Sequence, residues 1–264
     1  MHDTMRENAL ARRLREGETA LGAWLSFPDA LVAEAMASLG WDWLLIDMEH
    51  GPTGLSDAAA VATAIRTRAT APFVRPAWNE SSHIQRTLDL GCSGIVVPVI
   101  NTAADARAVV QDARFPPLGE RSRGGIRTPL AFDTDAMTYA QHANANVVVL
   151  VQIETELAVR NVEEIVAVEG IDGTFVGPND LAASIGARWP DVWERDTGYM
   201  DLVRRVASVT NAAGKTAGFL ARDPAMAQQV AAMGYRFIGV SSDANFLMGA
   251  AKRALDDTRA AIRA

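Results

Sequence analysis

Polar side chains of the types that move protons or bind metals follow several apolar runs of this sequence. Glu154 ends one run and Asp180 follows the next. Two carboxylates suit a hard divalent cation such as Mg²⁺ or Mn²⁺, because these ions prefer oxygen ligands. His50 and Arg75 follow two earlier runs. Histidine exchanges protons near neutral pH and a fixed arginine stabilises developing negative charge, so the four residues predict metal-assisted acid–base chemistry.

Two further residues have a place beside this set. Gln152 stands two positions before Glu154, so both side chains would lie on one face of a strand. Trp24 lies inside an apolar run and could form an apolar wall of a pocket. Structural interpretations compete, because Asp180 could cap a helix and His50 could be a satisfied structural histidine. The number of such residues at the ends of apolar runs favours the functional interpretation.

The elements that would position these residues repeat along the chain. Short apolar or β-branched runs bounded by Gly, Pro, Asp or Asn predict eight strands: Leu21–Phe27, Trp41–Met48, Pro72–Trp78, Gly94–Ile100, Asn146–Glu154, Gly173–Val176, Thr216–Leu220 and Phe237–Ser241. Stretches with helical spacing fill the gaps. Eight strand–helix units in 264 residues predict an α/β fold, a (β/α)₈ TIM barrel with an extra N-terminal helix over Thr4–Arg15.

An open, doubly wound sheet is the alternative fold. Such sheets usually carry fewer strands and a glycine-rich turn after the first, whereas residues 26–29 here contain no glycine. The one long irregular segment is Phe115–Thr134, and a loop of that length in a compact domain is often functional. In a barrel the carboxyl ends of the strands meet at one rim, which is where the polar residues above would gather.

Composition and charge exclude several classes of function. The chain has 25 basic and 32 acidic side chains and a net charge of −7, so binding to nucleic acid or anionic lipid is not expected. Cys92 is the only cysteine, which excludes internal disulfides and cysteine-rich zinc modules. No uninterrupted apolar run of ~18 residues predicts a membrane span, and no targeting segment is visible. We expect a soluble, cytoplasmic protein with one domain over residues 1–264.

Several of these segments together resemble the metal-dependent class II pyruvate aldolases of the HpcH/HpaI family, of the 4-hydroxy-2-oxoheptane-1,7-dioate aldolase type. The resemblance spans nearly the whole chain, and the order of the segments is more specific than any one of them. The matching segments are residues 22–24, 42–52, 74–76, 88–91, 115–121, 151–155 and 176–181, which read Gly-Ala-Trp, Asp-Trp-Leu-Leu-Ile-Asp-Met-Glu-His-Gly-Pro, Val-Arg-Pro, Leu-Asp-Leu-Gly, Phe-Pro-Pro-Leu-Gly-Glu-Arg, Val-Gln-Ile-Glu-Thr and Val-Gly-Pro-Asn-Asp-Leu.

The resemblance implies a chemistry for the strand-end residues. Glu154 and Asp180 would hold a divalent cation such as Mg²⁺, Mn²⁺ or Co²⁺. Arg75 would face the keto oxygen of a 2-keto acid, and His50 would be the catalytic histidine. Asp89 would orient that histidine. The implied reaction is the reversible cleavage of a 4-hydroxy-2-keto acid to pyruvate and an aldehyde through an enolate, with oxaloacetate decarboxylation or cleavage of a 2-dehydro-3-deoxy sugar acid as related alternatives.

The resemblance also implies substrate contacts and an assembly. Gln152 would line the site, the backbone at Asn179 and Asp180 would seat the pyruvate carboxylate, and the loop residue Arg121 would lie near the site or serve a neighbouring subunit. The last helix, within Ala244–Ala264, would be exchanged between subunits of a homo-oligomer, a hexamer built as a trimer of dimers.

Competing classes of enzyme need residues that this chain lacks at the right positions. A class I aldolase needs a lysine at a strand end for a Schiff base, but Lys215 precedes a predicted strand and Lys252 lies in the last predicted helix. A sugar-phosphate isomerase barrel usually carries a glycine-rich phosphate site after its last two strands, and residues 220–223 and 241–244 contain no glycine. A barrel without catalytic activity is the remaining, less favoured alternative.

Overall fold

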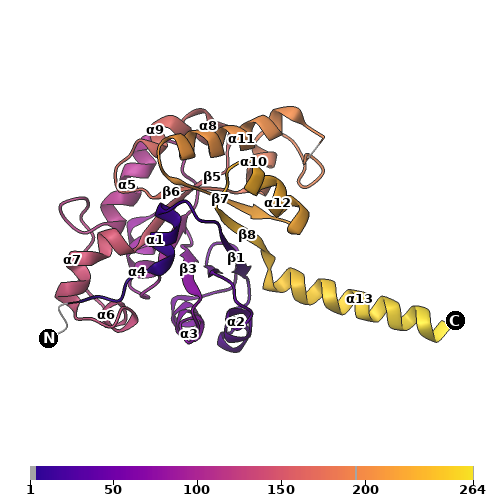
Figure 1. Ribbon diagram of the computed structural model, residues 1–264, viewed down its shortest axis with the longest axis horizontal. Coiled ribbons are helices and arrows are strands. Elements are labelled where there is room, and N and C mark those ends of the chain that lie inside the picture. The colour runs from indigo at the N-terminus through magenta and orange to yellow at the C-terminus, as the bar shows by residue number, and fades with distance from the viewer. Residues whose placement is uncertain (1–3, 194, 264) are drawn as a thin grey trace.

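The predicted strands close into a parallel barrel in the structure, a computed structural model that describes residues 4–193 and 195–263. Neighbours in the barrel follow chain order, and the last strand pairs with the first (Figure 1). The strands are β1 (Ala20–Leu25), β2 (Trp43–Asp47), β3 (Ala71–Arg75), β4 (Gly94–Val97), β5 (Val148–Ile153), β6 (Gly173–Val176), β7 (Thr216–Ala221) and β8 (Phe237–Ser242). The prediction of a (β/α)₈ barrel is confirmed.

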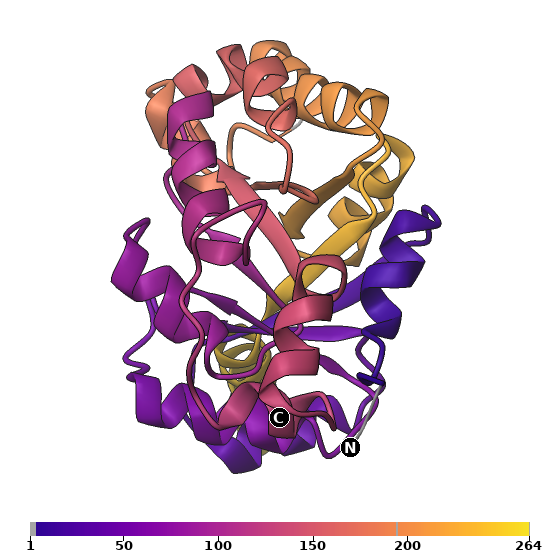
Figure 2. The same ribbon diagram turned by 90° about the vertical axis from the view of Figure 1, so that its left-hand side faces the viewer.

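Helices surround the strands (Figure 2). They are α1 (Ala9–Arg15), α2 (Ala30–Ala37), α3 (Leu55–Ile65), α4 (Ser81–Leu88), α5 (Ala103–Ala113), α6 (Arg127–Ala131), α7 (Ala136–Asn146), α8 (Glu156–Arg160), α9 (Val162–Val166), α10 (Pro178–Ser184), α11 (Thr197–Ala212), α12 (Pro224–Ala232) and α13 (Asp243–Arg263). Their side-chain caps follow the expected pattern, since Asp29, Asp135 and Asp223 each accept backbone N–H bonds at a helix start.

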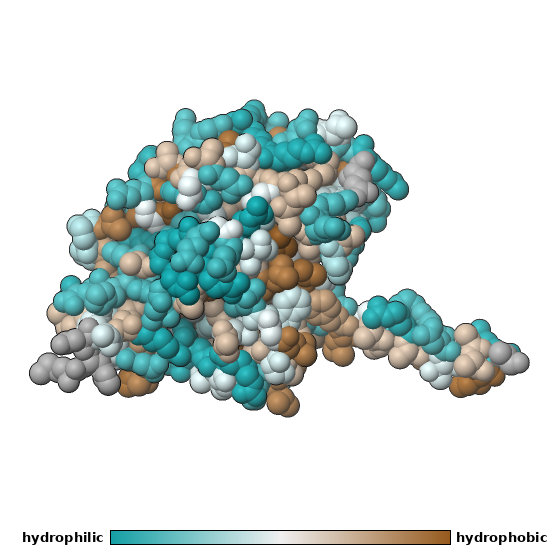
Figure 3. All heavy atoms as spheres, in the orientation of Figure 1, coloured by the Kyte–Doolittle hydropathy of each residue, from teal (hydrophilic) through white to brown (hydrophobic). Residues whose placement is uncertain are grey.

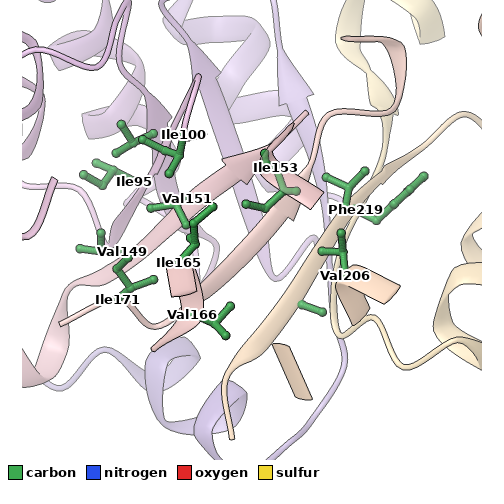
Figure 4. Packing of buried hydrophobic residues seen from close by; sticks show 14 of the residues in the cluster. Ile95, Ile100, Val149, Val151, Ile153, Ile165, Val166, Ile171, Val206 and Phe219 are labelled. Carbon is green, nitrogen blue, oxygen red and sulfur yellow. The ribbon is translucent and has the colours of Figure 1, made fainter. Parts of the chain in front are cut away.

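The strands are apolar on both sides because both faces of the barrel wall are covered. Val149, Val151 and Ile153 of β5 belong to the core between the barrel and its outer helices, as Figure 4 shows. Leu150, between them, belongs to a second cluster that fills the barrel interior. Aromatic rings dominate that interior, and Trp43 and Phe237 stack with their ring centroids 3.9 Å apart.

The amino-terminal end of the barrel is closed by α1. Leu10 and Leu14 pack against the interior cluster from that end. Just before the helix, the Asn8 side-chain amide donates hydrogen bonds to the carbonyl oxygens of Ser93 and Asn146, at 2.9 and 2.7 Å. The predicted extra helix is therefore present, although it begins at Ala9 rather than Thr4.

Two local predictions were wrong. The fifth strand begins at Val148, because residues up to Asn146 form the unpredicted helix α7, which Asp135 caps through the N–H groups of Met137 and Thr138. The segment Phe115–Thr134 is not wholly irregular, since it contains α6.

The last helix stands apart from the barrel. Helix α13 leaves β8 and projects into solvent (Figure 1), and Asp243 is its only buried residue among those described. Within the described part of the chain, none of the helices is both long and apolar enough to cross a bilayer.

Candidate active site

Strand alternation brings the polar residues to the carboxyl rim of the barrel. Five residues of the interior cluster or packed against it are Leu45, Phe73, Leu150, Phe175 and Leu220. Because successive side chains on a strand point to opposite faces, residues two positions further on point to the same side, toward the barrel axis. Those residues are Asp47, Arg75, Gln152, Gly177 and Arg222. All five line one cavity of about 320 Å³, together with Trp24, His50, Asn179 and Asp180.

Arg75 is held in a rigid, buried arrangement. Its Nε and Nη2 atoms donate to the two carboxylate oxygens of Asp47 at 2.9 and 2.7 Å, and the register places these residues side by side on β3 and β2. The guanidinium lies over the Trp24 ring, 4.2 Å from its centroid. Arginine has five N–H groups, so N–H groups remain for a bound oxygen in the cavity. Arg75 is 4% exposed, and its charge acts in surroundings from which water is largely excluded.

Glu49 forms the outer part of this network. Its Oε2 atom lies 2.7 Å from Arg75 Nη1, an ion pair that lacks the alignment of a hydrogen bond. Burial raises the pKa of Glu49 and the Arg75 charge partly offsets that effect. The Asp47 carboxylate also accepts the backbone N–H groups of Glu49 and His50, at 3.1 and 3.3 Å, so it shapes the turn that carries the histidine.

Glu154 is a buried carboxylate with two fixed donors. The N–H of Val99 donates to Oε1 at 2.7 Å, and the Gln152 side-chain amide donates to Oε2 at 2.5 Å. Burial raises the pKa of Glu154 to about 7, with further contributions from the charges of Asp180 and Glu49, while the Val99 bond acts in the opposite direction. Val99 has a φ of 58°, a strained conformation for a β-branched residue, and this backbone turn aims its N–H at the carboxylate.

Asp180 and Asn179 stand in the first turn of α10, directly after β6. Both are exposed at the cavity, and Asp180 is close enough to Glu154 to raise its pKa. Gly177 precedes them. A Cβ there would lie 2.6 Å from Gln152 Nε2 and 2.7 Å from Glu154 Oε2, so a larger residue would displace the ends of these two side chains.

His50 lies at the mouth of the same cavity. Its side chain is 65% exposed, and the carboxylate that it faces is Glu49, with Nε2 4.0 Å from Oε2. An exposed imidazole beside a cavity can exchange protons with both solvent and ligand.

Two predicted residues are brought together away from the cavity. Arg121 is buried, donates to Asp89 at 2.9 Å and to the Tyr139 hydroxyl at 3.3 Å, and lies over the Phe115 ring. Neither Asp89 nor Arg121 is among the residues that line the cavity. Within one chain, Asp89 pairs with Arg121 instead of His50, so its role in orienting the histidine stays a prediction.

The structure adds residues that the sequence did not single out. Asp47 and Glu49 stand in the same strand-end segment as His50, but their link to Arg75 depends on the register of β2 and β3. Val99 has an apolar side chain, which gives no sign of a role in the site. Gly177 matters because the side chains of Gln152 and Glu154 lie against it. Each of these signals is a contact between strands, which spacing along the chain does not reveal.

Oxygen donors at the cavity and next to it fit a hard cation, although Glu154 itself is not among the residues that line the cavity. Glu154 and Asp180 are carboxylates, and the buried Gln152 Oε1 has no hydrogen-bond partner. A buried polar atom without a partner is costly, and a cation would satisfy it. Among residues 4–193 and 195–263, no group of three or more His, Cys, Asp or Glu side chains is arranged to hold a metal, so further ligands would be this amide, water or substrate.

Comparisons with known proteins identify the family of this chain. The model of the HpcH/HpaI aldolase/citrate lyase family matches residues 20–250. The 2-keto-3-deoxy-L-rhamnonate aldolase of Salmonella paratyphi B is 41% identical over 239 residues, which cover 89% of this chain and 87% of that protein.

Solved structures show the same relationship. The HpcH/HpaI aldolase/citrate lyase family protein of Burkholderia cenocepacia superposes with a TM-score of 0.88 at 38% identity, over 96% of this chain and 99% of that one. The citrate synthase SbnG superposes with a TM-score of 0.86 at 27% identity, over 97% and 99% of the two chains. This chain therefore belongs to the HpcH/HpaI aldolase/citrate lyase family, and it is an enzyme of the pyruvate-aldolase type within that family.

Proposed function

We propose that this enzyme reversibly cleaves a 4-hydroxy-2-keto acid to pyruvate, or a pyruvate analogue, and an aldehyde, with the help of a divalent cation. The observation that carries the proposal is the pairing of unlike groups at one cavity. Asp180 lies on one side, near the buried Glu154 that accepts a hydrogen bond from the lining residue Gln152, and the fixed Arg75 guanidinium lies on the other. Such a pairing suits a 2-keto acid, whose neighbouring carboxylate and carbonyl oxygens need positive charge around them.

Glu154 and Asp180 would hold the cation, with Gln152 beside them. Mg²⁺, Mn²⁺ and Co²⁺ are the candidates because the donors are oxygen atoms. When bound, the cation supplies a Lewis acid that favours negative charge on the keto oxygen. Such a charge would favour the ionised carboxylate and so lower the pKa of Glu154, which burial and the nearby charges of Asp180 and Glu49 raise to about 7.

Arg75 would stabilise the charge that develops on the keto oxygen as the C3–C4 bond breaks. Its two hydrogen bonds to Asp47 hold the guanidinium in place before the reaction, so little reorganisation is needed in the transition state. Trp24 covers the face of the guanidinium and forms the apolar wall beside it. The amides at Asn179 and Asp180 would receive the pyruvate carboxylate.

His50 would move the proton at the C4 oxygen. In the cleavage direction the C4 hydroxyl gives its proton to the imidazole, directly or through water, as the C3–C4 electron pair passes to C3 and the C4 carbon becomes the aldehyde carbonyl. Protonation of C3 then yields pyruvate. In the synthesis direction His50 returns the proton to the new alkoxide. Asp89 stays the residue predicted to orient His50, and Arg121 stays a predicted contact near the site or for a neighbouring subunit.

A 2-keto-3-deoxy sugar acid is the second candidate substrate. The observation that favours it is the name of the Salmonella paratyphi B relative, a 2-keto-3-deoxy-L-rhamnonate aldolase at 41% identity. Such acids are themselves 4-hydroxy-2-keto acids, so the same residues would act on them. The enolate chemistry would also permit oxaloacetate decarboxylation.

A coupled assay of pyruvate release tests this function. A panel of 4-hydroxy-2-keto acids is offered to the enzyme after treatment with a chelator and after Mg²⁺, Mn²⁺ or Co²⁺ is restored. We expect no release in excess chelator and recovery with at least one of the metals. Full activity in excess chelator, or trapping of a protein–pyruvate adduct by borohydride, would contradict the proposal.

We also propose that the working enzyme is a homo-oligomer, a hexamer with exchanged last helices. Helix α13 exposes Phe246, Leu247, Leu255 and Ile262, and a groove of about 850 Å³ between its base and α2 is lined mainly by apolar side chains. Apolar surface lies beside the base of α13 in Figure 3. Exposed apolar surface of this extent favours burial against another subunit.

Truncation of α13 after Asp243 tests the assembly. We expect dissociated or aggregated, inactive protein, because the partner surface is lost. Asp243 is kept because its carboxylate accepts the backbone N–H groups of Ser26 and Phe27 within the same chain. A well-folded, active monomer of the full chain in light scattering at micromolar concentration would rule the assembly out.

A further inference from the structure

The wall of the cavity formed by β7, β8 and the end of β1 differs from the wall that carries the chemistry. Its polar side chains are Ser26, Arg222, Ser241, Ser242 and Asn245. The two carboxylates among the residues that line the cavity, Asp47 and Asp180, follow β2 and β6. The wall around Arg222 therefore offers hydrogen-bond donors and one cation, with no lining carboxylate of its own.

Arg222 is directed toward the cavity by strand alternation. Leu220, two positions earlier on β7, packs against the cluster inside the barrel. Arg222 follows on the same side of the strand, above the interior and at the mouth of the cavity, which it lines. An arginine on the alternate face would have met the outer helices instead.

The guanidinium is anchored along one edge only. Asp223 caps α12, and its Oδ1 atom accepts the N–H of Met226 at 2.9 Å. Its Oδ2 atom accepts Arg222 Nε at 2.8 Å. In the described part of the chain, no hydrogen bond engages Nη1 or Nη2 of Arg222. These two nitrogens are spaced to meet two oxygens of a carboxylate or phosphate at once.

A substrate longer than pyruvate would extend into this part of the cavity if its pyruvate end lies at the opposite wall. The pyruvate end would be bound by Arg75, Glu154 and Asp180, and the carbons beyond C4 then lie in the remaining volume. We propose that Arg222 binds an anionic group, a carboxylate or a phosphate, at the distal end of the aldehyde part of the substrate. The inference rests on the proposed aldolase function and adds to it the residue that selects among aldehydes.

The competing interpretation is that Arg222 and Asp223 form an ordinary surface ion pair. The Arg222 side chain is 52% exposed, so solvent screens its charge and the expected preference is moderate. A surface pair would give no preference among aldehydes, whereas an anion-binding arginine would. The named substrate of the Salmonella paratyphi B relative ends in a methyl group, so an anionic preference in this enzyme would also distinguish it from that protein.

The test compares aldehydes of matched size in aldol addition to pyruvate. Succinic semialdehyde is compared with the neutral 4-oxobutanamide, and glyceraldehyde 3-phosphate with glyceraldehyde; the first pair probes carboxylate and the second phosphate. We expect the wild-type enzyme to show a kcat/KM at least about fivefold higher for the anionic member of one pair, and Arg222→Met to abolish that preference. Arg222→Lys should keep part of it.

Two controls separate the possible outcomes. Arg204→Met removes another half-exposed arginine that is ion-paired on α11, and it should leave the ratio unchanged. Exchange of the C3 protons of pyruvate in D₂O needs no aldehyde, so it reports on the proposed function alone. Wild-type exchange without any anionic preference, or a preference that survives Arg222→Met, would overturn the role of Arg222. If the wild-type enzyme does not exchange the C3 protons of pyruvate at all, both the proposed function and this inference are overturned.

Discussion

The two walls of the active-site cavity are built in opposite ways. On the side of β2, β3 and β5, the charged groups are buried and hold one another: Arg75 is fixed by Asp47, and Glu154 by Val99 and Gln152. On the side of β7 and β8, the polar residues are partly or fully exposed, and Arg222 is held along a single edge. Different strand ends of one barrel rim thus produce a rigid wall and a loose one.

The difference separates chemistry from selectivity. Stabilising charge in a transition state requires groups that are already in position and shielded from water, as on the rigid wall. Recognising the variable end of a substrate requires groups that can be exchanged without disturbing the barrel, as on the loose wall. We therefore expect substitutions on the rigid wall to abolish turnover and those on the loose wall to alter substrate preference.

The largest effect is expected from Glu154→Gln. The amide cannot carry the negative charge that a cation needs, so kcat/KM for pyruvate release should fall at least ~10³-fold and Mn²⁺ binding should weaken in calorimetry. Asp180→Asn should behave similarly. Glu163→Gln is the matched control, since Glu163 pairs with Arg205 on the surface. Undiminished metal binding by Glu154→Gln would remove this residue from the metal site.

Arg75→Met and Arg75→Lys should each lower kcat/KM by roughly 10²- to 10³-fold. Lysine keeps the charge but cannot bond both oxygens of Asp47, so it should rescue little. Removal of the partner also leaves Asp47 buried and unpaired, and the free energy of unfolding should fall by about 3 kcal/mol or more. Urea denaturation and circular dichroism identify any loss that is due to unfolding. Wild-type rates in Arg75→Lys would show that a point charge suffices.

The stability of the metal-free protein should depend on Glu154. Its pKa is about 7 in the folded state against an ordinary value of 4.5, so between these values the folded state binds more protons than the unfolded state. The free energy of unfolding should then decrease as the pH rises from about 4.5 to 7, by about 3 kcal/mol for this group.

Denaturation of the chelator-treated protein across this pH range measures the effect. Glu154→Gln should remove the part of the pH dependence of the unfolding free energy that is due to this group. A divalent cation should reduce the same dependence in the wild-type protein, because the cation favours the ionised carboxylate. A slope that is the same in the wild-type protein and in Glu154→Gln would show that other groups cause it.

His50→Asn should lower aldol cleavage roughly 10²-fold while the protein keeps its metal. Exchange of the C3 protons of pyruvate should survive better than cleavage, because it does not involve the C4 oxygen. Comparing the two rates in D₂O measures this difference. An equal loss of both would contradict the assignment of His50 to the C4 oxygen.

The smallest effect is expected from Ser242→Ala on the loose wall. The residue is half-buried, and its hydroxyl accepts the backbone N–H of Asn245 at 3.3 Å. Water can replace a hydroxyl beside the cavity, so KM for the aldehyde should rise no more than about threefold at unchanged kcat. Steady-state kinetics with pyruvate held at saturation test this. A large fall in kcat would show that the loose wall also takes part in the chemistry and would erase the distinction between the two walls.

The pattern of apolar runs was sufficient to predict the barrel, because eight parallel strands covered on both faces leave a strong signal. Helix α7 was missed because Ala136–Asn146 is an uncharged segment with few helical signals apart from its Asp135 cap. The site residues were predicted because they follow the apolar runs that predict the strands. Asp89 and Arg121 lie elsewhere in the single chain because their pairing depends on how a long loop packs.

The sequence by itself determined the barrel, the rim and the residue types that gather there, since strand alternation and apolar runs are local properties of a chain. Only the tertiary structure decided which groups engage each other: Asp47 with Arg75, Val99 with Glu154, and Asp223 with one edge of Arg222. These contacts depend on strand register, a strained backbone turn and a helix cap. Their electrostatic consequences follow from burial, which no spacing of residues along a chain specifies.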